Sequence, residues 1–242
     1  MMENDINETT SAADSKEKLG DKNHNSLGEL LEIKPENRDP SWEQRFFHAL
    51  TLGQLSIISA EAQMGPDGWP YLLASTEANS NEPFQKILHW LSQKGIGLVI
   101  NPQKEYPDYV FTYGMLWHFK ETGLFFKDHI ATNKPSQREG VYQFTVKDIQ
   151  LCGSPSEAYL PQYVRKIMKE FLAQQGVLIP KVLAFSLDGQ NFDLAFSKES
   201  LGNPDPTEHQ GILEALSWFL PLHYQITLVS EKELPWPFAA LY

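Results

Sequence analysis

The sequence has a single cysteine and no long apolar run, and both absences exclude classes of protein. Cys152 has no second cysteine with which to form an intramolecular disulfide, so we expect a cytoplasmic protein kept in a reducing compartment. No apolar run approaches the length of about 18 residues that a membrane-spanning helix needs, so we expect no membrane partner. The first 25 residues are polar and acidic and lack an apolar centre, which is not the pattern of a signal or transit peptide.

Positive charge is also scarce, because 20 Lys and Arg residues stand against 31 Asp and Glu residues and give a formal net charge of −11. An anionic surface repels a phosphate backbone, so we expect no nucleic-acid partner. The densest basic group is Arg165, Lys166 and Lys169, which falls in a predicted helix. We interpret it as a solvated helix face.

Signatures of catalysis and metal binding are missing as well. The seven histidines are scattered, and none has the spacing of HxH or HExxH or pairs with the cysteine at zinc-ligand spacing. The "GIG" at 95–97 precedes a strand, whereas a phosphate-binding loop follows a strand and opens a helix. Cys152 lies several residues before the nearest predicted helix start, too far for helix activation of a thiolate. We therefore predict no catalytic residue, no metal and no cofactor.

Residues 1–40 contain no aromatic side chain and many charged ones. Such a segment buries too little apolar area to offset its chain entropy, so we predict a disordered acidic tail over 1–40. Within it, "SLGELLEI" places Leu27, Leu30 and Leu31 on one helical face. We interpret this stretch as a frayed helical turn; the alternative is a helix that docks on a partner or on the body of the same chain.

From Trp42 onward, the hydrophobic pattern predicts helices and strands in alternation. In the first half we expect a helix over 40–53, strands over 54–63 and 69–77, a helix over 82–94 and a buried strand over 96–100. In the second half we expect a helix over 159–176, a hairpin over 181–197, a helix over 203–221 and a strand over 223–231. The hairpin prediction depends on the Asp188-Gly189 turn. In both halves the predicted order of elements is helix, strand, turn, strand, helix, strand.

This repeated order predicts an α+β fold of two similar modules, each a small, mostly antiparallel sheet packed with two helices. We place the N-terminal module at 41–126 and the C-terminal module at 149–242, both within the usual range of domain sizes. Residues 127–148 form a polar linker and a connecting strand, which is free to pair with either sheet.

Aromatic residues crowd two stretches, one near the end of the first module and one at the end of the chain. Trp and Tyr are enriched at protein interfaces, because one end of each side chain is apolar and the other polar. The candidate protein-contact residues are Tyr106, Tyr109, Tyr113, Trp117, Trp236, Phe238 and Tyr242. The competing interpretation is that these side chains form an aromatic core.

Two stretches resemble a known family. "GIGLVINPQKEYPDYVF" is similar to a segment of the N-terminal domain of SseB-like (enhanced serine sensitivity) proteins, and "IQLCGSPSEAYLPQYVRKIMKEFLAQQG" is similar to the segment that opens their C-terminal domain. The resemblance covers roughly residues 50–242 and is clearest over 148–242. It implies a two-module cytoplasmic bacterial protein without established catalytic activity, and therefore supplies no catalytic residues.

Three functional hypotheses follow. The first is a non-enzymatic accessory or adaptor protein that binds another protein. The second is a small-molecule binder or enzyme with a site in the cleft between the modules, which requires polar groups such as His118, Asp108 and Cys152 to converge. The third is a self-associating protein, a homodimer, that pairs through a sheet edge.

Overall fold

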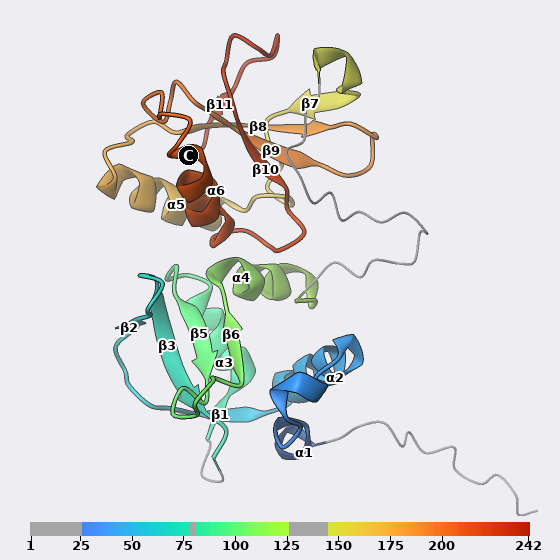
Figure 1. The fold of residues 1–242 in the computed structure, drawn as a ribbon, viewed down its shortest axis with the longest axis vertical. Coiled ribbons are helices and arrows are strands. Elements are labelled where there is room, and N and C mark those ends of the chain that lie inside the picture. The colour runs from blue at the N-terminus through green and yellow to red at the C-terminus, as the bar shows by residue number, and fades with distance from the viewer. Residues whose placement is uncertain (1–25, 78–80, 126–144) are drawn as a thin grey trace, which may run out of the picture.

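The structure is a computed structural model that describes residues 26–77, 81–125 and 145–242 (Figure 1). Two mixed sheets stand in two lobes of the molecule, each accompanied by helices. The predicted α+β fold of two modules is confirmed, and each sheet is mostly antiparallel with one parallel pair of strands.

The first sheet has the strand order β4-β1-β3-β5-β6, with β2 also paired to β3. Its strands are β1 (Gln54–Ile57), β2 (Gln63–Met64), β3 (Pro70–Ser75), β4 (Glu82–Pro83), β5 (Gly97–Ile100) and β6 (Tyr109–Phe111). The central pair, β3 and β5, is parallel, and the other pairs are antiparallel. β5 is buried along its whole length, as its continuous apolar sequence predicts.

The helices of the first module are α1 (Leu27–Leu31), α2 (Pro40–Thr51), α3 (Phe84–Leu91) and α4 (Tyr113–Thr122), with a 3₁₀ turn at Pro35–Asn37. Helices α2 and α3 confirm the two helices expected there. The carboxylate of Asp39 caps α2 by accepting the hydrogen bond from the Trp42 amide at 2.7 Å. Pro40 then occupies the first turn, where it needs no donor.

Residues 26–39 are ordered, which corrects the prediction of disorder over 1–40 for this part; residues 1–25 lie outside the described ranges. Ser26 caps α1 through a reciprocal capping box with Glu29, and Leu30 is fully buried against the first core. The Trp42 indole donates to the Leu30 carbonyl oxygen at 2.8 Å. The helical face seen in the sequence therefore docks on the body of its own chain.

Helix α4 was missed by the sequence pattern. Thr112 caps its start by accepting from the Met115 amide, and Gly123 ends it in a left-handed conformation with φ of 75°. All residues from Tyr113 to Phe119 are buried, so the helix has no polar face before its last three residues, Lys120 to Thr122. A helix enclosed on all sides lacks the 3.6-residue alternation on which the prediction depended.

The second sheet has the order β10-β9-β8-β11, and β7 pairs with β8 beside β11. The elements of this module are β7 (Leu151–Gly153), α5 (Gln162–Gln174), β8 (Lys181–Ser186), β9 (Asp193–Ser197), α6 (His209–Ser217), β10 (Ile226–Val229) and β11 (Ala239–Ala240), preceded by a 3₁₀ turn at Val146–Asp148. The predicted hairpin is confirmed as the antiparallel pair β8–β9. The connecting strand expected within 127–148 is not found in the described part of that range, because Val146–Asp148 form the 3₁₀ turn and β7 begins only at Leu151. Residues 126–144 lie outside the described part.

Helix α6 begins later than predicted. The Asp205 carboxylate accepts from the amide and the hydroxyl of Thr207 within a turn that precedes the helix. The helix itself starts at His209 and ends at Ser217, four residues before Pro221. Trp218 keeps helical φ and ψ as the C-cap of α6, and Trp218, Phe219 and Leu220 lie against the first module.

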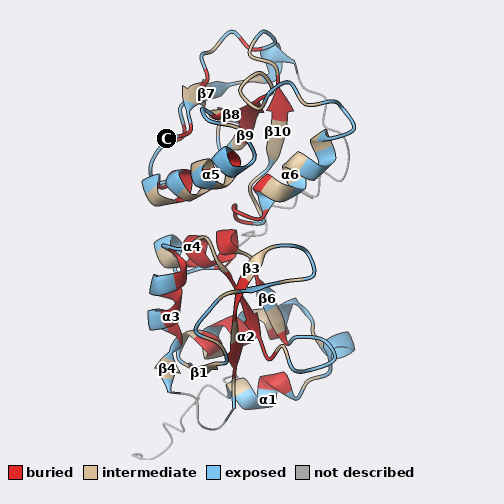
Figure 2. Ribbon diagram, turned by 90° about the vertical axis from the view of Figure 1, so that its left-hand side faces the viewer, coloured by how far each residue is buried: buried red, intermediate tan, exposed pale blue. Residues whose placement is uncertain are grey.

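Three groups of buried side chains form the interior, shown red in Figure 2. The first belongs to the N-terminal module and the third to the C-terminal module. The second is continuous across both modules. The two modules therefore share a core.

Candidate functional site

The shared core defines a module seam, formed by residues from the sheet and α4 of the first module and from the segment after α6 of the second. Its members are Tyr71, Val99, Tyr113, Trp117, Trp218, Phe219 and Leu220, all buried. Figure 1 shows α4 at the face of the first module that meets the second. A seam built of large buried aromatics joins the modules into one hydrophobic unit.

Three hydrogen bonds involve the seam residues and join the two modules. The indole N–H of Trp117 donates to the Phe219 carbonyl oxygen at 2.7 Å, and the indole N–H of Trp218 donates to the Tyr71 hydroxyl at 3.1 Å. The Gly114 amide donates to the Trp218 carbonyl oxygen at 3.2 Å. Both indoles thus bury their apolar rings and still satisfy their single donor, as buried tryptophan requires.

The Tyr71 hydroxyl links this seam to a turn of the first module, because it donates to Asp67 Oδ2 at 2.6 Å. Burial, together with this hydrogen bond, raises the pKa of Tyr71 to about 12. The phenol therefore stays protonated at neutral pH and acts as a donor to Asp67 and an acceptor from Trp218.

Ring stacking and one close backbone approach complete the seam. Trp69 stacks on Trp218 with ring centroids 4.6 Å apart, and Phe171 of α5 lies 5.2 Å from Trp69. A Cβ atom at Gly114 would overlap the backbone of Leu220, so only glycine allows this approach. The cleft between modules that the second hypothesis required is filled at this seam by side chains.

The structure separates the seven candidate contact residues. Tyr113 and Trp117 are buried in the seam and Phe238 in the core of the second module, so their assignment as partner contacts is wrong. The Tyr113 hydroxyl donates to the Ser92 carbonyl oxygen at 2.8 Å, which also corrects the idea that it faces solvent. These three belong to the aromatic core that was the competing interpretation.

Of the other four, Tyr109 and Trp236 are half-buried, and the Tyr109 hydroxyl donates to Glu43 Oε1 of α2. Only Tyr106, at 70% exposed, and Tyr242, at 54%, present most of their surface to solvent. They belong to different modules, so the candidates do not form a single contact surface.

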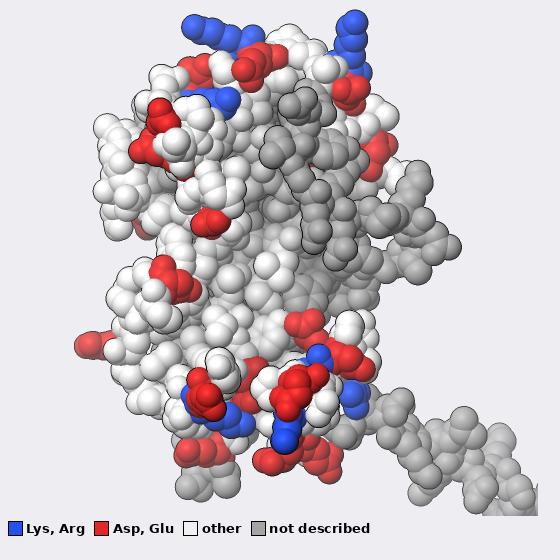
Figure 3. Space-filling view, viewed as in Figure 1, with Lys and Arg blue, Asp and Glu red and all other residues white. Residues whose placement is uncertain are grey.

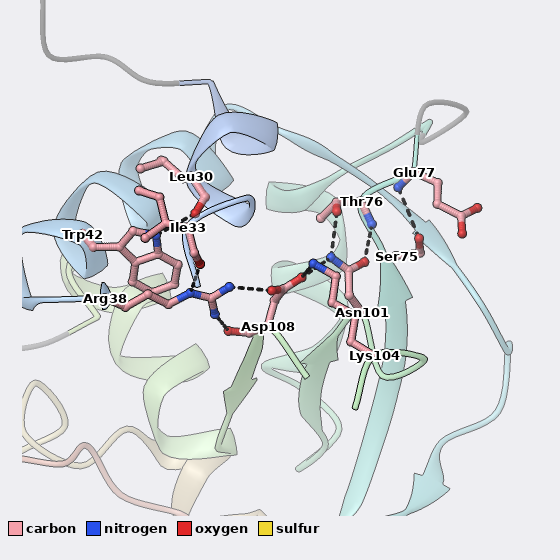
Figure 4. Close-up of polar contacts among 10 residues, drawn as sticks. All are labelled: Leu30, Ile33, Arg38, Trp42, Ser75, Thr76, Glu77, Asn101, Lys104 and Asp108. Carbon is pink, nitrogen blue, oxygen red and sulfur yellow. Dashed lines mark hydrogen bonds and ion pairs between the residues drawn. The ribbon is translucent and has the colours of Figure 1, made fainter. Parts of the chain in front are cut away.

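A polar cluster surrounds the Asn101-Pro102 turn (Figure 4). Asn101 has a positive φ of 53° and is buried, and its amide nitrogen donates to Asp108 Oδ2 at 2.7 Å and to Thr76 Oγ1 at 2.8 Å. Its side-chain oxygen accepts from the Thr76 amide at 2.9 Å. Asparagine tolerates left-handed geometry better than most residues, and here its side chain holds the ends of β3 and β5 together.

Asp108 is the buried acid of this cluster and is paired with two cations. Its carboxylate lies 2.7 Å from Arg38 and 2.7 Å from the Lys104 ammonium. Burial raises the pKa of Asp108, but hydrogen bonds from Lys104, Asn101 and Arg38 outweigh burial and hold the pKa below its usual range. With every group partnered, the cluster works as a clamp that fixes residues 33–38 to the sheet, and it has no free acid or base for catalysis.

The three polar groups proposed for a cleft do not converge. Asp108 belongs to the clamp, His118 lies on α4 against Trp117 and His223, and Cys152 pairs with Phe185 in the second sheet. Burial raises the pKa of the Cys152 thiol, which disfavours the reactive thiolate. The specific constellation required by the second hypothesis is therefore absent among these residues.

His118 lies on α4 next to the seam residue Trp117. It is buried, and its Nε2 atom has no hydrogen-bond partner within the described part of the chain. The ring centroid of His223 lies 4.7 Å from that of His118. The described residues contain no group of three or more His, Cys, Asp or Glu side chains that could hold a metal ion.

An exposed apolar surface lies at the outer edge of β8 and β11. Leu178, Ile179 and Tyr242 are 70%, 66% and 54% exposed, and we call these three the C-terminal patch. The Leu241 amide donates to the Pro180 carbonyl oxygen at 2.8 Å, so backbone hydrogen bonding between the two segments extends one residue beyond the β8–β11 pair. The Lys169 ammonium lies 5.6 Å from the Tyr242 ring centroid and borders the patch.

A groove of about 330 Å³ runs between α3 and α4 on the first module. Leu88 and Phe119 supply apolar lining, and Gln85, His89 and Lys120 supply polar lining. This volume is at the lower end of the range for small-molecule sites.

The charge distribution agrees with the acidic composition. On the face shown in Figure 3, the coloured Lys and Arg side chains lie near the two ends of the molecule, with no basic stripe between them. Arg165 corrects one expectation, since it is buried and donates to the Leu160 carbonyl oxygen at 2.7 Å rather than lying on a solvated face. Across residues 26–77, 81–125 and 145–242, no helix is long and apolar enough to cross a membrane.

Comparisons of the chain with protein-family models, curated proteins and solved structures give no match. The SseB-like resemblance therefore stays a prediction that depends on the sequence segments themselves.

Proposed function

We propose that this chain is a non-enzymatic cytoplasmic accessory or adaptor protein, of the SseB-like kind, that binds another protein through the C-terminal patch. The observation that carries the proposal is the exposure of three large apolar side chains next to the β8–β11 pair: Leu178 and Ile179 just before β8, and Tyr242 just after β11. Contiguous exposed apolar side chains with a polar border are typical of protein-contact sites. Lys169 supplies part of that border.

The arrangement of the patch suits a protein partner. The seam joins the modules through shared side chains, so the patch is carried on a body with little freedom to rearrange. Tyr242 is of a residue type that is enriched among the energetically dominant residues of interfaces, and Leu178 and Ile179 add apolar contact area.

The test is affinity capture from the native cell with the full chain and with the variants Ile179→Glu and Tyr242→Ser. We expect a protein that the wild-type chain retains and both variants lose. Leu52→Glu is the matched control, because Leu52 is 78% exposed and lies on the first module. A retained protein that all four chains capture equally would contradict the assignment of the patch.

A second candidate function is small-molecule binding in the groove between α3 and α4, favoured by its mixed apolar and polar lining. Mass spectrometry of the chain purified under native conditions distinguishes the two. A bound metabolite that is lost in Phe119→Ala favours the groove. Self-association through a sheet edge predicts a dimeric mass in light scattering, and the adaptor proposal itself requires only a monomer.

A further inference from the structure

We infer that His118 and His223 form a two-imidazole site for a divalent transition-metal ion, with Zn²⁺ as the best-fitting ion, across the module seam. His118 comes from α4 of the first module, and His223 from the segment that leads into β10 of the second. The inference goes beyond the proposed adaptor function and depends on different residues.

The first observation is the state of His118. The residue is only 7% exposed, and its Nε2 atom has no hydrogen-bond partner among the described residues. A buried polar atom without a partner is costly, and native structures usually satisfy it with protein, water or an ion. A nitrogen in this position is a ready metal ligand, because imidazole coordinates through one ring nitrogen.

The second observation is the placement of His223. Its ring centroid lies 4.7 Å from that of His118, and the ring planes are inclined by 61°. With Zn–N bonds of about 2.0–2.1 Å, an ion in the ring plane stands about 3.2 Å from each ring centre. For one nitrogen of each ring directed at the same ion, the observed centroid separation corresponds to an angle of about 95° between the two ligands, which lies near the ligand angles of octahedral and tetrahedral complexes.

The protonation state of His118 is also compatible with metal binding. Metal binding needs neutral imidazole, and burial lowers the pKa of His118 below its ordinary value. Imidazole nitrogen suits Zn²⁺, Ni²⁺ and Cu²⁺ better than it suits Mg²⁺ or Ca²⁺, which prefer oxygen.

The site has a route to solvent on the side of the second module. His223 is half-buried, and the adjacent Leu222 is 63% exposed. An ion bound by two protein ligands keeps coordination positions for water, so its affinity should be lower than that of structural sites with four protein ligands. Because the two histidines come from different modules, binding would stabilise the seam by mass action.

The test uses the full chain after treatment with a chelator. Calorimetric titration with Zn²⁺ should show one ion per chain, and His223→Gln should weaken binding at least tenfold. The matched control is His89→Gln, because His89 is an exposed histidine on α3 outside the seam, and this variant should bind as the wild type does. Titration with Co²⁺ should give visible absorption bands in the wild type and in His89→Gln but not in His223→Gln.

A second measurement avoids any dependence on the folding of a variant. Imidazole ¹⁵N resonances of the wild-type chain should shift on addition of Zn²⁺ at His118 and His223 and stay unchanged at His89. Absence of binding, binding retained in His223→Gln, or shifts confined to other histidines would overturn the inference.

Discussion

The two modules contain similar sheets but close the second face of the sheet differently. In the C-terminal module, Leu183 and Phe185 are covered by Leu234 and Phe238 of the same module. In the N-terminal module, one sheet face lies under its own helices, whereas Tyr71 and Val99 of the other face lie in the seam. Residues of the second module therefore bury part of one face of the first sheet.

This difference indicates that the two modules share the order of their helices and strands but not the packing of their sheets. The N-terminal module also has α4, whose buried residues contact its own core on one side and the seam on the other. The structure of the N-terminal module therefore depends on residues 218–220, whereas the core around Leu183 and Phe185 is formed by residues of the C-terminal module alone.

The largest effect is expected from Gly114→Val, which breaks the seam at its closest backbone approach. The new side chain would overlap the Leu220 backbone, and overpacking of this kind costs about 3 kcal/mol of unfolding free energy. Urea denaturation should show this loss, with the N-terminal module unfolding first. Gly211→Ala in α6 is the control, because nothing lies within 4 Å of its added Cβ, and this variant should be neutral or slightly stabilised.

Asp108→Asn tests the clamp that holds residues 33–38 on the first module. The variant leaves the mostly buried Arg38 guanidinium without its counter-charge, and we expect a loss of about 2 kcal/mol at pH 7. Urea denaturation at pH 7 measures the loss, and Glu61→Gln, which removes an exposed carboxylate, should show little change.

The same variant has a predicted pH dependence. The pKa of Asp108 is lower in the folded chain than in the unfolded chain, so its contribution to stability is full above the unfolded value of about 3.9. That contribution is lost as pH falls through the folded pKa. The stability difference between wild type and Asp108→Asn should therefore shrink below about pH 4, and a difference that grows in acid would contradict the clamp.

Trp117→Phe sharpens the comparison by removing one hydrogen bond across the seam while keeping an aromatic ring. The Phe219 carbonyl oxygen loses its donor, and we expect a cost of about 1–2 kcal/mol in thermal or urea unfolding. Trp90→Phe, at a 42% exposed site on α3, is the matched control and should be nearly neutral. Equal effects of the two substitutions would show that the seam hydrogen bond adds nothing.

The smallest effect concerns Cys152 in the second module. Burial raises the pKa of its thiol, so the thiolate is rare at neutral pH. Alkylation by iodoacetamide at pH 7 should be slower in the folded chain than after unfolding in urea. A faster reaction in the folded chain would reveal an activated thiol and reopen the enzymatic hypothesis.

The sequence predicted the elements whose signals are local. α2, α3, α5 and the β8–β9 hairpin each combine apolar periodicity with a turn or cap, and these features lie within a few residues of one another. α4 was missed because enclosure on all sides removes periodicity, although Thr112 and Gly123 are recognisable caps in hindsight.

The contacts of the seam and of the clamp could not be predicted from the sequence for a different reason. Trp117 and Phe219 are 102 positions apart, and Arg38 and Asp108 are 70 apart. No local pattern links such residues, so Tyr113 and Trp117 looked like surface candidates when they are core. For Leu30 the error was the opposite one: its acidic neighbours led to a prediction of disorder, whereas Leu30 is buried in the core against α2.

The sequence separation between Trp117 and its acceptor Phe219 also implies a delay during synthesis on the ribosome. A ribosome adds about 5–20 residues per second, so roughly 5–20 s pass between the emergence of α4 and that of Phe219. During this interval the nascent first module exposes Tyr71, Val99 and Trp117 as an open apolar face. Translation speed, and chaperones able to shield that face, should therefore govern the yield of native protein more strongly than the local folding of either sheet.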